Sequence, residues 1–62
     1  MNEKEIDKEV LEAAIKLFGG DYVEAIIWLN RPHLALGNVR PVDASPDDVL
    51  RLIGQIEQGV YN

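Results

Sequence analysis

The 62-residue chain contains no cysteine, so neither a disulfide nor a cysteine-ligated metal stabilises it. A chain of this length buries only about 60% of the surface that its unfolded form exposes, which leaves a small net stability. The amino-terminal residues are charged and no long apolar run follows them, so we expect neither a signal peptide nor a membrane span. These absences favour one small domain, residues 1–62, in the reducing environment of the cytoplasm.

Clusters of basic side chains are also absent. The chain has eleven acidic residues against six Lys and Arg, a net charge of −5. The basic residues are scattered, at Lys4, Lys8, Lys16, Arg31, Arg40 and Arg51. Binding to a phosphate backbone draws on grouped Lys and Arg. We therefore expect no direct nucleic-acid binding and no DNA-binding domain in this chain.

Residue sets typical of catalysis or metal binding are missing too. His33 is the only histidine, and nothing near it in sequence has metal-ligand spacing. Ser45 has no activating base nearby in sequence, and no glycine-rich phosphate loop follows a strand. The sequence therefore predicts neither an enzyme nor a protein with a cofactor or metal.

Helical patterns dominate what is present. Residues 3–18 contain strong helix formers, and their apolar side chains cover roughly 200° of the circumference, wide enough to bury two sides. Gly19-Gly20 ends this helix and Asp21 caps the next, which runs to about Asn30. Apolar residues surround that second helix except for a narrow strip at Glu24. We expect it to be the central helix, covered on most sides.

A third helix is signalled by its ends. Ser45 is a good N-cap, and Pro46 suits the first helical position. The helix runs to about Gln58, with Gly59 as its C-cap. Gly54 lies inside it, where glycine costs roughly 1 kcal/mol relative to alanine. Either a close helix–helix approach or simple tolerance explains that glycine.

The connector between the second and third helices, residues 31–44, is unusually apolar. Connectors normally lie on the surface and are polar, so these apolar side chains pack onto the protein or against a partner. Gly37-Asn38 marks a turn, and we expect at most one short 3₁₀ turn. Trp28 projects away from the main apolar face, so it is either covered by the connector or offered to a partner. The predicted fold is all-α, a small bundle of three main helices with an irregular apolar connector.

The order and spacing of several short motifs carry a family resemblance. From about Ala13 to Tyr61 the chain resembles the toxin-binding domain of Xre/MbcA/ParS-type antitoxins. The matching motifs are Leu17-Phe18-Gly19-Gly20, Trp28-Leu29, Asn30-Arg31-Pro32-His33-Leu34-Ala35-Leu36-Gly37, Arg40-Pro41-Val42 and Ile53-Gly54-Gln55-Ile56-Glu57-Gln58-Gly59-Val60-Tyr61. The chain departs from the family in the segment between Pro41 and Val49, which is shortened.

This resemblance implies a partner and a site. Such antitoxins pair with RES-domain toxins, which consume NAD⁺, and the carboxy-terminal end of the antitoxin covers the toxin's active-site cleft. The blocking end would be Gly59, Val60, Tyr61 and Asn62. The surface that supports or contacts the toxin would comprise Trp28, Asn30, Arg31, Pro32, His33 and Leu36. Family members commonly carry an amino-terminal DNA-binding region, and residues 1–62 show no counterpart of it.

Two alternatives remain open from the sequence. Val60 and Tyr61 either block a partner or fold back over Phe18 or Trp28 and close the core. The chain could also be a small helical self-association module, a homodimer without a toxin partner, which the wide apolar stripe over residues 3–18 favours.

Overall fold

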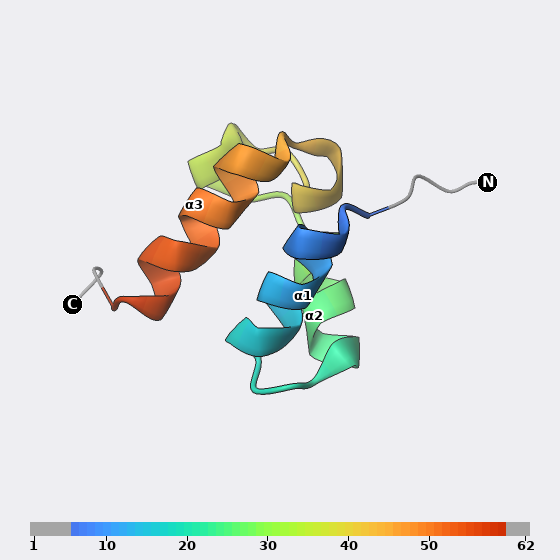
Figure 1. Cartoon of the computed structure of the whole chain (residues 1–62). Helices are drawn as coiled ribbons and strands as arrows, with labels where there is room; N and C mark the ends of the chain where they lie inside the picture. Colours follow the sequence, from blue (N-terminus) through green and yellow to red (C-terminus); the bar gives the residue numbers. More distant parts are fainter. Residues whose placement is uncertain (1–5, 60–62) are drawn as a thin grey trace.

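Three α-helices and two 3₁₀ turns make up the computed structural model, which describes residues 6–59. In chain order they are α1 (Lys8–Leu17), α2 (Tyr22–Leu29), η1 (Leu34–Leu36), η2 (Pro41–Asp43) and α3 (Pro46–Glu57) (Figure 1). The predicted all-α fold is confirmed, because the sole β-type pairing within residues 6–59 is an isolated antiparallel bridge between His33 and Val39. None of the helices in the described part of the chain is long and apolar enough to cross a membrane.

Helix α1 begins later than the sequence pattern indicates. Residues 6 and 7 are not helical, so the predicted start at residue 3 is wrong for that part of the range. The reason is an N-cap at Asp7, whose Oδ1 accepts hydrogen bonds from the backbone N–H groups of Glu9 (2.9 Å) and Val10 (3.3 Å). An N-cap residue has non-helical backbone angles, and its side chain satisfies amides that lack intrahelical partners. The Asp7 cap therefore sets the start of α1 at Lys8.

The turn between α1 and α2 agrees with its prediction. The Gly20 N–H donates to the Ile15 carbonyl (2.8 Å), and the Gly19 N–H donates to the Lys16 carbonyl (3.0 Å). This pair of bonds is a Schellman motif, which satisfies the last carbonyls of a helix. Both glycines have positive φ, 66° and 95°, a region that other residues enter only at a cost. The chain reverses at this point, and α2 packs beside α1.

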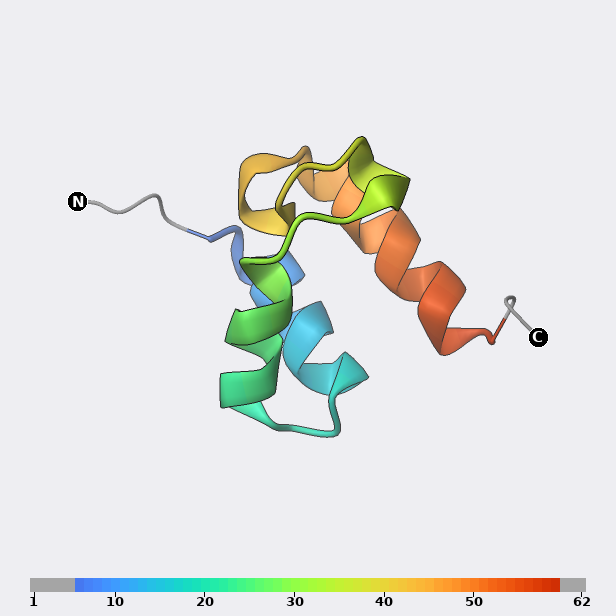
Figure 2. The same cartoon turned by 180° about the vertical axis from the view of Figure 1, so that it is seen from behind.

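Helix α1, not α2, is the central helix. It packs against both α2 and α3 (Figures 1 and 2), which accounts for its wide apolar stripe. Each helix contributes one pair to the buried core, and these are Val10 and Ala14, Ala25 and Leu29, and Val49 and Ile53. The prediction that α2 is covered on most sides is wrong, because its Tyr22, Val23 and Ile27 are 57%, 64% and 44% exposed.

Helix α3 starts and stops as predicted to within a residue. Ser45 occupies the N-cap position and Pro46 the first helical position, although the Ser45 side chain makes no capping hydrogen bond. Gly59 follows the helix with φ 68°, the left-handed conformation that ends helices. Of the two explanations offered for Gly54, a close helix approach does not apply, because a Cβ there would meet no heavy atom within 4 Å beyond its own helix backbone and chain neighbours. The remaining explanation is that α3 tolerates a glycine at this position.

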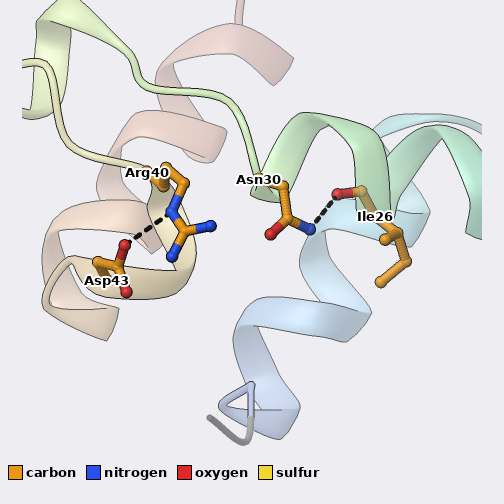
Figure 3. Close-up of polar contacts among 4 residues, drawn as sticks. All are labelled: Ile26, Asn30, Arg40 and Asp43. Carbon is orange, nitrogen blue, oxygen red and sulfur yellow. Dashed lines mark hydrogen bonds and ion pairs between the residues drawn. The ribbon is translucent and has the colours of Figure 1, made fainter. Parts of the chain in front are cut away.

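The connector holds two 3₁₀ turns, one more than predicted. The second, η2, is spanned by an ion pair between Arg40 Nε and Asp43 Oδ2 at 2.7 Å (Figure 3). Pro41 is buried, and Leu36, Val42 and Ala44 pack half-buried against the core. Part of the connector therefore packs over the helices, as predicted, whereas Leu34 and Val39 are 88% and 36% exposed.

Candidate partner-binding surface

Trp28, at the end of α2, is covered by the connector. Its ring centroid lies 4.7 Å from that of His33 with an interplanar angle of 39°, and 6.4 Å from that of Phe18 at 60°. Offset and tilted ring pairs at these separations are favourable contacts. Of the two readings of Trp28, the structure supports cover by the connector. The side chain remains half-buried, so part of it still faces solvent.

The His33 side chain joins the start of the connector to the end of α2 through a hydrogen bond. Its Nε2 lies 3.3 Å from the Trp28 carbonyl oxygen. Because a carbonyl only accepts hydrogen bonds, Nε2 carries the proton in this contact. The Trp28 carbonyl also accepts from the Arg31 N–H (3.2 Å), so the His33 side chain adds a second hydrogen bond to a carbonyl at the end of α2. This fixes the path of the chain directly after Pro32.

The segment 33–39 is closed by its own backbone. The His33 N–H donates to the Val39 carbonyl (3.2 Å), and the His33 carbonyl accepts from the N–H groups of Leu36 (2.9 Å) and Asn38 (2.9 Å). Gly37 and Asn38 both have positive φ, 76° and 64°, which confirms the predicted turn. Glycine and asparagine are the residues that enter this region at least cost. The segment is a defined loop with Leu34 exposed upon it.

Three of the predicted site residues come together at one shallow pocket. A hollow of about 160 Å³ is lined by Phe18, Glu24, Ile27, Trp28, Arg31 and His33. Ligand pockets for drug-sized molecules are roughly 300 to 1,000 Å³, so this hollow is too small for such a ligand. Its lining combines three apolar side chains with the acid Glu24, the base Arg31 and His33. These properties suit a protein surface that receives one or two side chains of a partner.

The remaining three residues of the predicted contact surface lie elsewhere. The Asn30 Nδ2 donates to the Ile26 carbonyl at 2.9 Å and so completes the end of α2 (Figure 3). Pro32 is exposed. Leu36 is half-buried and faces a separate hollow of about 380 Å³, lined also by Ala35, Asp48, Arg51, Leu52 and Gln55. The predicted contact residues therefore do not form one patch, because Trp28, Arg31 and His33 share the hollow beside α2 whereas Leu36 lines the hollow beside α3.

The predicted blocking end lies mostly outside the described residues. Gly59 is half-buried, directly after α3, whereas Val60, Tyr61 and Asn62 are not among the residues that the structure describes. The carboxy-terminal turns of α3 diverge from α1 and α2 in both views (Figures 1 and 2). Gly59 follows this diverging end of α3.

Sequence reasoning missed the exposed apolar side of α2. Val23 and Ile27 are one helical turn apart, and so are the buried Ala25 and Leu29 on the other side. Both sides of the helix are apolar, so periodicity alone does not say which one meets the core. The sequence feature that indicates the buried side is the small side chain of Ala25, because a small residue permits the close approach of α1.

The described residues have the features of an interaction surface. Within residues 6–59 no group of three or more His, Cys, Asp or Glu could hold a metal ion. The surface instead offers exposed apolar side chains beside an ordered loop, which are typical of sites that bind other proteins. The fold and the surface define a small helical protein-binding domain.

Comparison with known proteins gives this domain a family. Residues 13–59 match the antitoxin Xre/MbcA/ParS C-terminal toxin-binding domain, and the chain belongs to that family. The resemblance carried by the Trp28 to Gly37 motif and the closing glycine is thereby confirmed. The family consists of binding domains, in agreement with the expectation that the chain is not an enzyme.

Two curated relatives share this region. The chain is 38% identical over 58 residues to a protein named Antitoxin Xre from Yersinia enterocolitica, and 39% identical over 58 residues to one of the same name from Photorhabdus laumondii. Each alignment covers 86% of this chain and 39% of the relative. The chain thus spans about two fifths of the length of these relatives. No solved structure matches it.

Proposed function

We propose that this chain binds a RES-domain toxin and neutralises it by occluding the NAD⁺ site with its carboxy-terminal end, Gly59 to Asn62. The observation that carries this proposal is the match of residues 13–59 to an antitoxin toxin-binding domain. Two relatives named as antitoxins, each nearly 40% identical, support it. The toxin class and the occlusion mechanism are what the family resemblance implies for this chain.

The end of α3 is well suited to this role. Gly59 has φ 68°, the left-handed conformation that ends α3. In sequence the next residues are Val60 and Tyr61. Tyrosine is enriched at interface hot spots because it joins a large apolar area to a polar tip. A tip of this kind at the end of a projecting helix fits the mouth of an active-site cleft.

The residues of the predicted contact surface have different proposed roles in toxin binding. Arg31 and Pro32 are exposed and are proposed as direct contacts. Trp28 contributes through the part of its ring that faces the shallow pocket. His33 and Asn30 hydrogen-bond to carbonyls at the end of α2 and so hold the contacting residues in place. Leu36 supports the α3 side of the same interface.

The cytoplasm is the proposed location, because a toxin that consumes NAD⁺ acts on the cytoplasmic pool. The alternative function, a self-association module without a toxin, loses its original support. The wide apolar stripe that favoured it lies on α1, where both α2 and α3 occupy it. A homodimer remains compatible with toxin binding, since each function needs only its own surface.

Co-expression with a RES-domain toxin from an adjacent reading frame tests the proposal. Cellular NAD⁺ is measured with the full chain and with a chain lacking Val60 to Asn62. We expect the full chain to preserve NAD⁺ and the shortened chain to allow its loss while still binding the toxin in a pull-down. Glu57→Ala, an exposed change on α3 that leaves the end intact, is the matched control and should still protect. Full protection by the shortened chain would refute occlusion, and absence of any complex would refute the toxin partner.

A further inference from the structure

Helix α3 carries apolar side chains that the buried core does not use. Leu52 and Ile56 are half-buried, yet neither is among the side chains that pack against the core within residues 6–59. They are four residues apart and so lie one helical turn from each other. Leu52 lines the hollow of about 380 Å³ together with Leu36 of η1. This apolar area is therefore free for another contact.

The same side of α3 runs from the hollow to the end of the helix. Side chains three and four residues apart share one side of a helix. This spacing connects the four α3 residues of the hollow with two residues beyond it, and the six form what we call the α3 stripe, namely Asp48, Arg51, Leu52, Gln55, Ile56 and Gly59. Gly59 is also the first residue of the proposed blocking end. The stripe is therefore continuous with that end.

The hollow is open and bordered by charge. Its connector wall, η1, lies beside the amino-terminal half of α3 (Figures 1 and 2). Asp48 and Arg51 are 3.9 Å apart, with side chains 58% and 72% exposed. An ion pair this long and this exposed contributes little stability, so both groups are available to a partner. Small-molecule pockets enclose most of their ligand, whereas these charged groups face solvent, so the hollow fits a protein surface.

We propose that the α3 stripe is the surface on which the RES-domain toxin docks, and that this contact supplies most of the binding affinity while the carboxy-terminal end supplies the inhibition. This inference rests on the proposed function. The toxin would present an apolar ridge bordered by basic side chains. The ridge fills the hollow between Leu36 and Leu52, and the bases lie against Asp48 and its exposed neighbour Asp47.

Continuity and charge are the reasons to choose the toxin as the occupant. A specific interface buries about 800 Å² on each partner, so four terminal residues need an adjacent surface to form one. The stripe is that adjacent surface. The net charge of −5 attracts a basic protein over a long range. A second copy of the chain is disfavoured here, because it would bring its own net negative charge to Asp47 and Asp48.

Calorimetric titration of the full chain with the purified RES-domain toxin of the adjacent reading frame tests the docking surface. Leu52→Glu should raise the dissociation constant at least about 100-fold, because it would bury an unpaired carboxylate in the interface. Val39→Glu, the same kind of change at an exposed connector position that does not line the hollow, should change it less than about twofold. The chain lacking Val60 to Asn62 should still bind within about tenfold of the full chain. Far-ultraviolet circular dichroism checks that each variant is folded.

A charge reversal tests the chemistry of the partner. Asp48→Lys should lower the association rate constant about tenfold at low salt and weaken its dependence on salt, because it removes attraction to the basic border. Glu12→Lys makes the same change in net charge at an exposed position of α1 and should have a clearly smaller effect. Equal effects of the two reversals would overturn the basic border.

The binding results separate this inference from the proposed function. If the full chain and Leu52→Glu bind the toxin equally tightly while the shortened chain loses the complex, the end supplies the affinity, and the docking surface is overturned while the proposed function stands. If the unaltered chain forms no complex, the toxin partner itself is refuted. If the unaltered chain binds the toxin but Leu52→Glu affects only self-association, a second copy occupies the stripe and the docking surface is again overturned.

Discussion

Truncating Leu29 should unfold much of this domain, whereas the same truncation at Leu34 should hardly affect it. Leu29 is 0% exposed and belongs to the core where α2 meets α1. Leu34 is 88% exposed on the connector loop. Both changes remove the same atoms from the same residue type. Any difference in stability therefore reports the environment of each side chain.

The expected magnitudes differ by several-fold. A fully buried Leu→Ala change costs about 3 kcal/mol or more, because the cavity adds to the lost transfer free energy. A domain of 62 residues has a total stability of roughly 3 to 9 kcal/mol. Leu29→Ala should therefore lower the midpoint of thermal unfolding by about 12 °C or more, or leave the chain partly unfolded at room temperature. Leu34→Ala should change the free energy of unfolding by less than about 0.5 kcal/mol.

Circular dichroism at 222 nm, followed against temperature and against urea, provides the assay. The original chain and both variants are compared at low concentration, so that self-association does not contribute to stability. Equal shifts for the two variants would refute the described packing. A larger shift for Leu34→Ala would show that the loop side chain, not α2, closes the core.

Five further variants test three kinds of local feature by urea unfolding. Gly54→Ala should stabilise the chain by about 0.5 to 1 kcal/mol, since its Cβ meets nothing, whereas Gly19→Ala should destabilise by about 1 kcal/mol at φ 66°. Shifts of the same sign would contradict this. Asp7→Ala should lower the free energy of unfolding by about 1 kcal/mol, and Ser45→Ala by less than half as much, because the Asp7 side chain accepts capping hydrogen bonds and that of Ser45 does not. Equal losses for the two variants would count against the capping described. His33→Ala should cost about 1 kcal/mol and shift the emission of the single tryptophan to the red, and an unchanged spectrum would show that the ring contact is absent in solution.

The helices were predictable because their signals are local. Gly19-Gly20, Asp21, Pro46 and Gly59 each act on the backbone within one or two residues, through caps and positive φ. The start of α1 was misplaced because residues 3–7 have good helix propensity, and the Asp7 cap competes with it. Propensity gives a tendency along the chain, while a cap decides one position.

Relations between helices were not predictable in the same way. An eight-residue helix that is apolar on both sides gives no periodic signal of which side is buried, so α2 was taken as central. The contact between Trp28 and His33 depends on where the chain turns after Pro32. That path is set by the hydrogen bond from the His33 N–H to the Val39 carbonyl, a contact that a linear sequence pattern does not contain. Leu36 lines a different hollow from Arg31 and His33 because of the same path of the chain, so the sequence pattern did not separate these residues either.

The ordered loop at residues 33–39 has an energetic consequence for any partner that touches Leu34. Backbone freedom is the largest cost of fixing a flexible segment upon association. In this loop the bridge, the 3₁₀ turn and two left-handed residues have already removed that freedom during folding. A partner that binds Leu34 therefore contacts a side chain on an already ordered backbone. Association restricts only that side chain, so this chain loses little conformational entropy on binding.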